Sequence, residues 1–361
     1  MTATVPLVLA PSPLGTVPGA VTRALPRSDG RRGDPYRLAA RLPSLVTEVE
    51  ASGRRVDRVL LVAPRRRGLA GTTPGPLLDV GDRWLPVGVL PADRPEQLQT
   101  WWAAARGRGA GGVDDQAPRP VVAAMGIDRF LAPAHRWLDE LATAGLDPVD
   151  RRASCTRREE LAEVLATGPD LVLYLGHGHH LGWSGYQGLR WHDLPPQQQP
   201  AGTVIALACA TLAQPGGQRG FGSRLVTAGR AVAYLGAARP VGTTDLVALG
   251  DALVRCLVAG VTGQVPPVRT LGDLVASLPT VLTGDGPAAV SPGEVVRVAR
   301  ALRGLRIVGD PAAPLGERRT LVDAPAATRP TAPARGGGLR PDARRQPPPV
   351  RPVGGRRRPS T

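Results

Sequence analysis

Two short apolar runs, each leading into a chemically reactive side chain, constrain this chain more than any other feature. The runs are Leu171–Leu175 and residues 204–208, and neither contains a charged residue. Runs of this kind are typical of strands that are buried on both faces of a parallel sheet. The first run leads into His177 and the second into Cys209. If the two strands are neighbours, the imidazole and the thiol lie at the carboxyl edge of the sheet, where open α/β sheets place their functional sites.

The rest of the chain alternates between strand and helix patterns. Short apolar runs predict further strands at residues 59–63, 121–125, 231–236 and 305–308. Helical spacing and capping residues predict helices at residues 36–49, 94–106, 130–141, 156–165, 221–228, 246–258, 271–278 and 291–302. One of these helices is predicted to begin with a capping box that joins Thr156 to Glu159. Alternation of strands and helices predicts an α/β fold with helices on both faces of a parallel sheet.

Composition suggests four segments. Residues 1–53 are poorly patterned. We predict an N-terminal α/β subdomain at residues 54–112 and the main α/β domain at residues 118–323. Residues 324–361 are rich in Arg, Pro and Gly and are predicted to form a disordered tail. The tail holds nine arginines and one aspartate, so +8 of the formal net charge of +15 lies there. The remaining chain is only mildly basic. We therefore expect no nucleic-acid partner beyond nonspecific contact by the tail.

The cysteines and the N-terminal residues predict the cellular compartment of the protein. Cys155, Cys209 and Cys256 are an odd number without metal-like spacing, which favours a reducing environment over a disulfide framework. The N-terminal residues lack the basic region of a signal peptide, and no apolar run approaches the roughly 20 residues of a membrane span. These observations predict a cytoplasmic protein with no membrane contact. No motif indicates a cofactor.

A cysteine beside a histidine predicts nucleophilic catalysis. Cys209 differs from Cys256 because an apolar run ends at Cys209, whereas Cys256 lies within an apolar helical run. In the catalytic interpretation the thiolate of Cys209 attacks a carbonyl carbon, and His177 acts as general acid and base. The alternative is a buried core cysteine and a structural histidine in a glycine turn.

The order of these motifs resembles that of the caspase-like clan (clan CD) of cysteine peptidases, and within it the gingipain-type family, C25. The Gly-His-Gly turn around His177, followed by Trp183, and the Ala-Cys pair at Cys209 resemble the family's two catalytic motifs. Further similar segments are residues 79–92, 221–225, 231–236 and 308–311. The resemblance extends over residues 56–323. It implies a caspase-like three-layer sandwich around a parallel sheet, with a smaller N-terminal α/β subdomain.

The resemblance also implies an activity. The chain would be a cysteine endopeptidase that hydrolyses peptide bonds through a thioester on Cys209, with His177 as the acid–base and without metal or cofactor. The backbone N–H groups of Gly178 and Cys209 would form the oxyanion hole, because fixed donors stabilise the developing negative charge. The expected partners are protein or peptide substrates.

Three further residues are candidates for substrate contact. The resemblance implies that Asp128 pairs with a basic P1 side chain, although the same aspartate could simply cap a helix. Trp183 could shape the rim of the site or pack in the interior. The family's pocket tryptophan is replaced by residues 242–245, and Arg239 could instead attract an acidic P1 side chain. The P1 preference stays open at this point.

Two other functions also stay open. A catalytically silent caspase-like module, acting as a scaffold or regulator, is suggested by the missing pocket tryptophan and by Val89, where relatives often carry arginine. A metal-binding hydrolase is suggested by His177, His179 and His180, although no acidic residue joins them at a recognised ligand spacing.

Overall fold

The computed structural model describes residues 4–10, 21–24, 35–63, 75–81, 83–92, 95–110, 120–197, 199–215, 218–283 and 290–316. These residues belong to one compact unit, which spans Met1–Arg319. The predicted tail at 324–361 lies outside the described residues.

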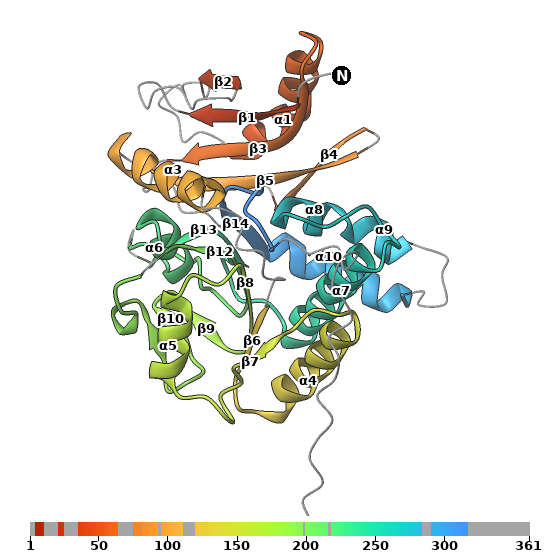
Figure 1. The fold of residues 1–361 in the computed structure, drawn as a ribbon. Helices are drawn as coiled ribbons and strands as arrows, with labels where there is room; N and C mark the ends of the chain where they lie inside the picture. Colours follow the sequence, from red (N-terminus) through yellow and green to blue (C-terminus); the bar gives the residue numbers. More distant parts are fainter. Residues whose placement is uncertain are drawn as a thin grey trace, which may run out of the picture. The chain divides into compact units, whose positions relative to one another are not determined.

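An 11-stranded sheet forms the centre of this unit (Figure 1). The strand order is β2-β1-β3-β5-β14-β13-β12-β8-β6-β7, and β4 pairs with β5 outside this path. The bounds are β1 Thr4–Ala10, β2 Val21–Ala24, β3 Arg55–Ala63, β4 Leu77–Val80, β5 Arg83–Pro91, β6 Val121–Ala124, β7 Val149–Asp150, β8 Leu171–Leu175, β12 Ala201–Leu207, β13 Ala231–Ala237 and β14 Leu305–Gly309. Neighbouring strands are parallel except for the pairs β4–β5 and β13–β14. The predicted, mainly parallel α/β fold is confirmed.

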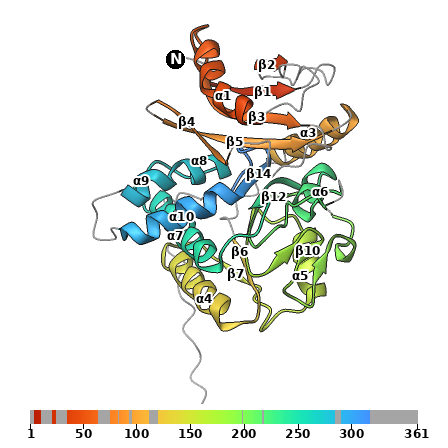
Figure 2. The same ribbon diagram turned by 180° about the vertical axis from the view of Figure 1, so that it is seen from behind.

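Helices cover both faces of the sheet, as the two opposite views show (Figures 1 and 2). One layer contains α4, α7 and α10, and the other contains α3, α5 and α6. The helix bounds are α1 Pro35–Glu50, α3 Pro95–Ala110, α4 Asp128–Thr143, α5 Arg158–Ala166, α6 Phe221–Thr227, α7 Thr243–Val261, α8 Leu271–Ala276, α9 Leu278–Thr283 and α10 Pro292–Gly304. Within the described ranges, no helix combines the length and the apolar character needed to cross a bilayer.

The strand β8 illustrates why its sequence is apolar throughout. Val172 and Tyr174 pack into the core that also contains side chains of α3, α5 and α6. Leu171, Leu173 and Leu175 pack into the opposite core, beside side chains of α4, α7 and α10. Successive side chains of a strand point to opposite faces. Every position of β8 therefore faces a core, which explains why each of its residues is largely apolar.

Residues 1–53 contribute more to the fold than their pattern predicts. They form β1, β2 and α1, and α1 confirms the helix expected at residues 36–49. β1 pairs in parallel with β3, and Leu7 and Leu9 are fully buried. The register shifts between Val5 and Pro6. A bulge of this kind is one of the few places where a strand tolerates proline. One continuous sheet therefore joins the three segments 1–53, 54–112 and 118–323.

The start of α5 corrects the predicted capping box. The helix begins at Arg158, its N-cap is Arg157, and Thr156 is buried one position earlier. The carboxylate of Glu160 accepts a hydrogen bond of 3.0 Å from the backbone N–H of Arg157. The acid whose side chain accepts from the N-cap backbone is thus Glu160 and not the predicted Glu159. Thr156 is buried before the helix start and does not serve as the N-cap.

Candidate active site

The turns that carry His177 and Cys209 meet at the carboxyl edge of the sheet. β8 and β12 are parallel neighbours, with Leu175 opposite Leu207. The backbone N–H of Gly176 donates to the carbonyl oxygen of Leu207 at 3.3 Å, which continues the pairing beyond the strand. The two turns approach so closely that a Cβ atom added to Gly178 would lie 3.1 Å from the carbonyl oxygen of Cys209.

The thiol of Cys209 lies at the base of a strained turn. Its Sγ donates to the carbonyl oxygen of Val241 at 3.2 Å, and the side chain is half-buried. The next residue, Ala210, has a φ of 53°, which is unusual for a residue other than glycine. Its N–H is held by the carbonyl oxygen of Arg239 at 3.3 Å. Strained backbone of this kind often occurs at functional sites, where surrounding contacts maintain it.

His177 is fixed through both its backbone and its ring. Its carbonyl oxygen accepts hydrogen bonds of 2.9 Å from the Tyr174 hydroxyl and from the backbone N–H of Ser184. The imidazole meets the ring of Phe130 edge-on, with 5.1 Å between ring centroids. Its Nε2 atom contacts the guanidinium of Arg129. Because arginine can only donate, Nε2 can take part in this contact only as an acceptor.

Gly178 and Cys209 carry backbone N–H groups at the contact between the two turns. Gly178 belongs to a small sheet formed by β9 (Gly178–His179), β10 (Gly182–Trp183) and β11 (Leu189–Arg190). Next to it in this sheet, the backbone N–H of Ser184 donates to the carbonyl oxygen of His177, so Ser184 and His177 are a hydrogen-bonded pair of the ladder. Pairs alternate in an antiparallel ladder, so the N–H of Gly178 points away from β10. In the described part of the chain, the N–H of Cys209 makes no backbone hydrogen bond.

Comparison with protein-family models matches residues 127–316 to peptidase family C25, which is more than half of the 361 residues. The chain belongs to peptidase family C25. Among solved structures, the crystal structure of the Arg-specific cysteine proteinase gingipain R (RgpB) aligns with a TM-score of 0.63 at 14% identity, covering 90% of this chain and 80% of that one. The complex of the pro- and mature domains of Porphyromonas gingivalis RgpB aligns with a TM-score of 0.57 at 14% identity, covering 87% and 80%. A search of curated proteins gives no significant match.

Family membership makes the chain a cysteine peptidase, and the structural likeness confirms the predicted gingipain-like fold. The match begins at Ile127, immediately before α4, and ends at Gly316, after β14. It therefore includes both turns of the candidate site and the strands that carry them.

The aromatic cluster beneath the His177 turn corrects the prediction for Trp183. Trp183 is fully buried in this peptidase, so its side chain lines no open rim. It stacks on Tyr174 with 4.2 Å between ring centroids and an interplanar angle of 8°. Its indole N–H donates to the Tyr234 hydroxyl at 3.2 Å, and Phe221 packs against its edge. Since Tyr174 also donates to the His177 carbonyl, Trp183 supports the His177 turn from the interior.

Asp128 and Arg129 lie in the first turn of α4. The N-cap of this helix is Ile127, so the alternative in which Asp128 caps the helix is wrong. The carboxylate of Asp128 is exposed and lies where the helix dipole favours negative charge. The sequence did not single out Arg129, which reaches His177 across 48 positions of the chain. Only the packing of α4 against β6, the neighbour of β8, could have indicated this contact.

Arg239 borders the Cys209 turn through its backbone, while its exposed side chain lies near a second arginine. The Nε atom of Arg239 is 3.6 Å from the position that a Cβ on Gly304 would occupy. Burial, together with the charge of Arg239, lowers the pKa of Arg306 to about 10. Positive charge therefore gathers where β13 ends and β14 begins.

The histidine cluster does not form a ligand set. His179 accepts a hydrogen bond of 3.1 Å from the backbone N–H of Leu181 through its Nδ1 atom. Burial and the neighbouring His180 and Arg190 lower the pKa of His179. Within the described residues, no three His, Cys, Asp or Glu side chains gather in an arrangement that could hold a metal ion. The metal-hydrolase hypothesis therefore finds no geometric support among these residues.

We expect alanine at Gly178 to disrupt the contact between the His177 turn and the Cys209 turn. The added Cβ would lie 2.8 Å from Cγ2 of Thr211 and 3.0 Å from Cβ of Ala208, so the turns must separate. Displacement of reacting groups by about 1 Å can lower activity roughly 100-fold. Peptidase assays should show a loss of this order for Gly178→Ala. Gly293→Ala is the matched control, because nothing lies closer than 4.0 Å to its added Cβ; equal activity of the two variants would contradict the prediction.

The three thiols should differ sharply in reactivity. Cys256 is buried within α7, and burial raises its pKa to about 12, so it stays protonated at neutral and mildly alkaline pH. Cys155 is exposed and Cys209 is half-buried. We expect iodoacetamide at pH 8 to modify Cys155 and Cys209 in the native peptidase, and Cys256 only after denaturation. Peptide mass spectrometry measures this, and rapid native labelling of Cys256 would contradict it.

Proposed function

We propose that this peptidase is an endopeptidase in which Cys209 is the nucleophile and His177 is the general acid and base. The observation that carries the proposal is the close approach of the two turns, which is such that a Cβ added at Gly178 would lie 3.1 Å from the Cys209 carbonyl oxygen. This contact brings a thiol, an imidazole and two backbone donors to one edge of the sheet. Membership of family C25 supports the same assignment.

The reaction proceeds in two halves. The thiol proton passes to His177, and the thiolate sulfur attacks the carbonyl carbon of the scissile peptide bond. The tetrahedral intermediate collapses as the C–N bond breaks, and His177 returns the proton to the departing amine. A thioester then links the acyl group to Cys209. His177 next removes a proton from water as the water oxygen attacks the thioester carbon. The C–S bond then breaks, the product acid leaves, and the sulfur of Cys209 takes the proton back from His177.

Backbone donors stabilise the charge that develops on the carbonyl oxygen. The N–H groups of Gly178 and Cys209 meet the requirement for fixed donors, because the ladder geometry turns the first away from β10 and the second has no backbone acceptor among the described residues. A preorganised donor of this kind contributes about 3–4 kcal/mol to transition-state stabilisation in well-studied hydrolases.

Arg129 must move before this cycle begins. Its guanidinium donates to Nε2 of His177, and the thiol of Cys209 donates to Val241 rather than to the imidazole. For Nε2 to accept the thiol proton, Arg129 has to withdraw. In the proposed cycle, Arg129 therefore withdraws from His177 when substrate binds.

The same observation favours the second candidate, a catalytically silent module. In that case Arg129 would hold His177 permanently, and the chain would act by binding other proteins. The two candidates differ in one measurable property, which is covalent reaction of Cys209 with a peptide electrophile.

Labelling with acyloxymethyl-ketone peptides tests the proposal. A panel with basic, acidic and apolar P1 residues is incubated with the full-length protein, and modified peptides are identified by mass spectrometry. We expect modification at Cys209 that is lost in His177→Ala, with the best probe reporting the P1 preference that Asp128 and Arg239 leave open. A correctly folded protein that no probe modifies at Cys209 supports the silent module instead.

A further inference from the structure

The strand order places a segment with an exposed arginine on each side of the His177 and Cys209 turns. β13, β12, β8 and β6 are consecutive parallel neighbours. The segment after β6 therefore borders the His177 turn, and the segment after β13 borders the Cys209 turn. The first contains Arg129 and the second Arg239, and both side chains are exposed. A substrate that reaches the thiol thus lies between two segments that contribute positive charge.

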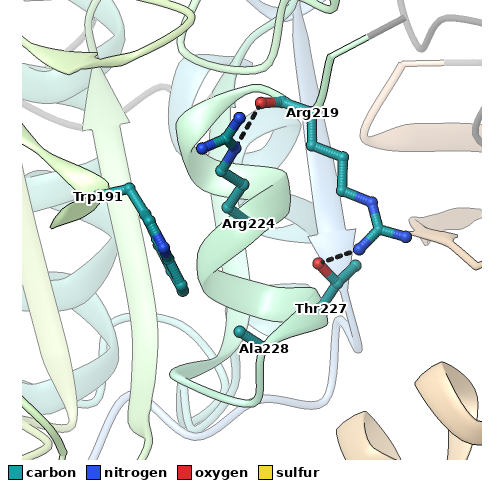
Figure 3. A pocket seen from close by; sticks show the side chains of 5 residues that line it. All are labelled: Trp191, Arg219, Arg224, Thr227 and Ala228. Carbon is teal, nitrogen blue, oxygen red and sulfur yellow. Dashed lines mark hydrogen bonds between the residues drawn. The ribbon is translucent and has the colours of Figure 1, made fainter.

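The guanidinium of Arg129 has an acceptor that uses little of what it offers. It donates to Nε2 of His177, which is a neutral ring nitrogen when it accepts, and it lies over the Phe130 ring, 5.0 Å from the centroid. Elsewhere in the described chain arginine side chains donate to oxygen atoms. In the open pocket beside α6, for example, Arg224 donates to the carbonyl oxygen of Arg219 at 3.0 Å (Figure 3). A carboxylate would offer Arg129 opposite charge and two parallel hydrogen bonds, so it would compete well with the imidazole.

No carboxylate of the described chain takes this place. Among the described residues, Arg129 forms no ion pair with an acid. Asp128 is its neighbour in the first turn of α4, and consecutive residues of a helix do not face each other. On the Cys209 side, Asp245 is only 5% exposed and lies 3.7 Å from the guanidinium of Arg300. A carboxylate that pairs with Arg129 would therefore come from a bound substrate.

We propose that this peptidase prefers an acidic residue at P1, and that the carboxylate of this residue draws the Arg129 guanidinium away from His177. The inference rests on the proposed function, in which Cys209 and His177 perform the cleavage. P1 is the residue whose carbonyl carbon bonds to the Cys209 sulfur, so its side chain must lie among the groups around the thiol and the imidazole. Pairing of the carboxylate with Arg129 releases Nε2 to accept the thiol proton. An acidic P1 residue thus both holds the substrate and completes the catalytic pair.

A basic P1 residue would have a different effect. It could pair with the exposed carboxylate of Asp128, but its positive charge would repel the guanidinium of Arg129 rather than attract it. Nothing in such a substrate would release the imidazole of His177. The two kinds of P1 residue therefore predict opposite consequences when the charge of Arg129 is removed or reversed.

Cleavage of three matched peptides by the full-length protein tests the proposal. The peptides differ only at P1, which is Asp, Asn or Arg. We expect the wild type to cleave the Asp peptide with a kcat/KM at least about tenfold above that of the Asn peptide, because a charge-assisted pair is made only with Asp. Arg129→Met should lose this preference and cleave the Asn peptide faster than the wild type, because its side chain cannot donate to His177. A merely structural role of Arg129 would instead lower the cleavage of all three peptides.

Arg297→Met is the matched control, since it removes the same charge from an exposed position on α10 and should keep the wild-type preference. Arg129→Glu provides a second variant, and the dipole of α4 favours an acid in its first turn, so the helix should persist. We expect this variant to cleave the Arg peptide faster than the Asp peptide.

Several outcomes would overturn the proposal. One is a wild type that cleaves the Asn or the Arg peptide as fast as the Asp peptide while Cys209 reacts with peptide electrophiles, which would leave the proposed function intact. Another is a preference for Asp that persists in Arg129→Met or Arg129→Glu. If the folded protein cleaves none of the peptides and no electrophile modifies Cys209, the proposed function fails, and this inference fails with it.

Discussion

Replacing Cys209 with alanine is expected to lower peptide hydrolysis by at least about 1,000-fold, because losing the nucleophile removes the covalent route and leaves only positioning and oxyanion stabilisation. The change removes one hydrogen bond, from Sγ to the Val241 carbonyl, at a half-buried position. The fold should therefore persist, which circular dichroism would show. Hydrolysis of an unstructured protein substrate measures the loss.

Cys155→Ala is the matched control for this experiment. Cys155 is also a free cysteine, but it is exposed and donates to the Arg152 carbonyl oxygen, outside the candidate site. We expect this variant to hydrolyse the substrate like the wild type. If Cys209→Ala and Cys155→Ala were equally active, Cys209 could not be the nucleophile, and the catalytic assignment would fail.

Replacing Trp183 with alanine is expected to lower the free energy of unfolding by about 3–5 kcal/mol, the usual cost of removing a fully buried tryptophan. The side chain is 0% exposed and stacks on Tyr174, so its removal leaves a cavity in the core. It also removes the hydrogen bond from the indole to the Tyr234 hydroxyl. Urea unfolding followed by far-ultraviolet circular dichroism measures the change without relying on tryptophan fluorescence.

Trp84→Ala offers a control with the same chemical change at the surface. Trp84 lies on β5 and is 43% exposed, and substitutions at such positions usually change stability by no more than about 0.5 kcal/mol. We also expect Trp183→Ala to lower activity, because Tyr174 loses the ring that positions its hydroxyl under His177. Equal unfolding midpoints for the two variants would show that Trp183 does not support the core as described.

The elements that the sequence predicts well are those whose environment imposes a simple pattern. β8 and β12 are covered by helices on both faces, and a largely apolar run is the composition that suits such a strand. The residues that follow these runs must then leave the sheet at its carboxyl edge. For this reason the pattern of the sequence predicts that His177 and Cys209 lie at that edge, and the pairing of β8 with β12 then brings their turns together.

Other elements give weaker signals because their patterns are interrupted or shifted. β1 contains Pro6, and a proline usually argues against a buried strand. The strand nevertheless forms, because it pairs with β3 through a bulge between Val5 and Pro6. The start of α5 depends on the burial of Thr156, which is a tertiary property and moves the cap by one residue. A tryptophan after a glycine loop is equally compatible with a rim or a core position, and only the stacking on Tyr174 decides for Trp183.

The sequence by itself determined the α/β class and the positions of the two strands that lead into the site, β8 and β12. It also determined the identity of the candidate thiol and imidazole. Each of these depends on local periodicity or on residue type. Only the tertiary structure decided the state of the site, in which Arg129 contacts His177 while Val241 accepts from Cys209. Contacts between residues far apart in the chain depend on how helices pack against the sheet, and a single sequence carries no local pattern that records this packing.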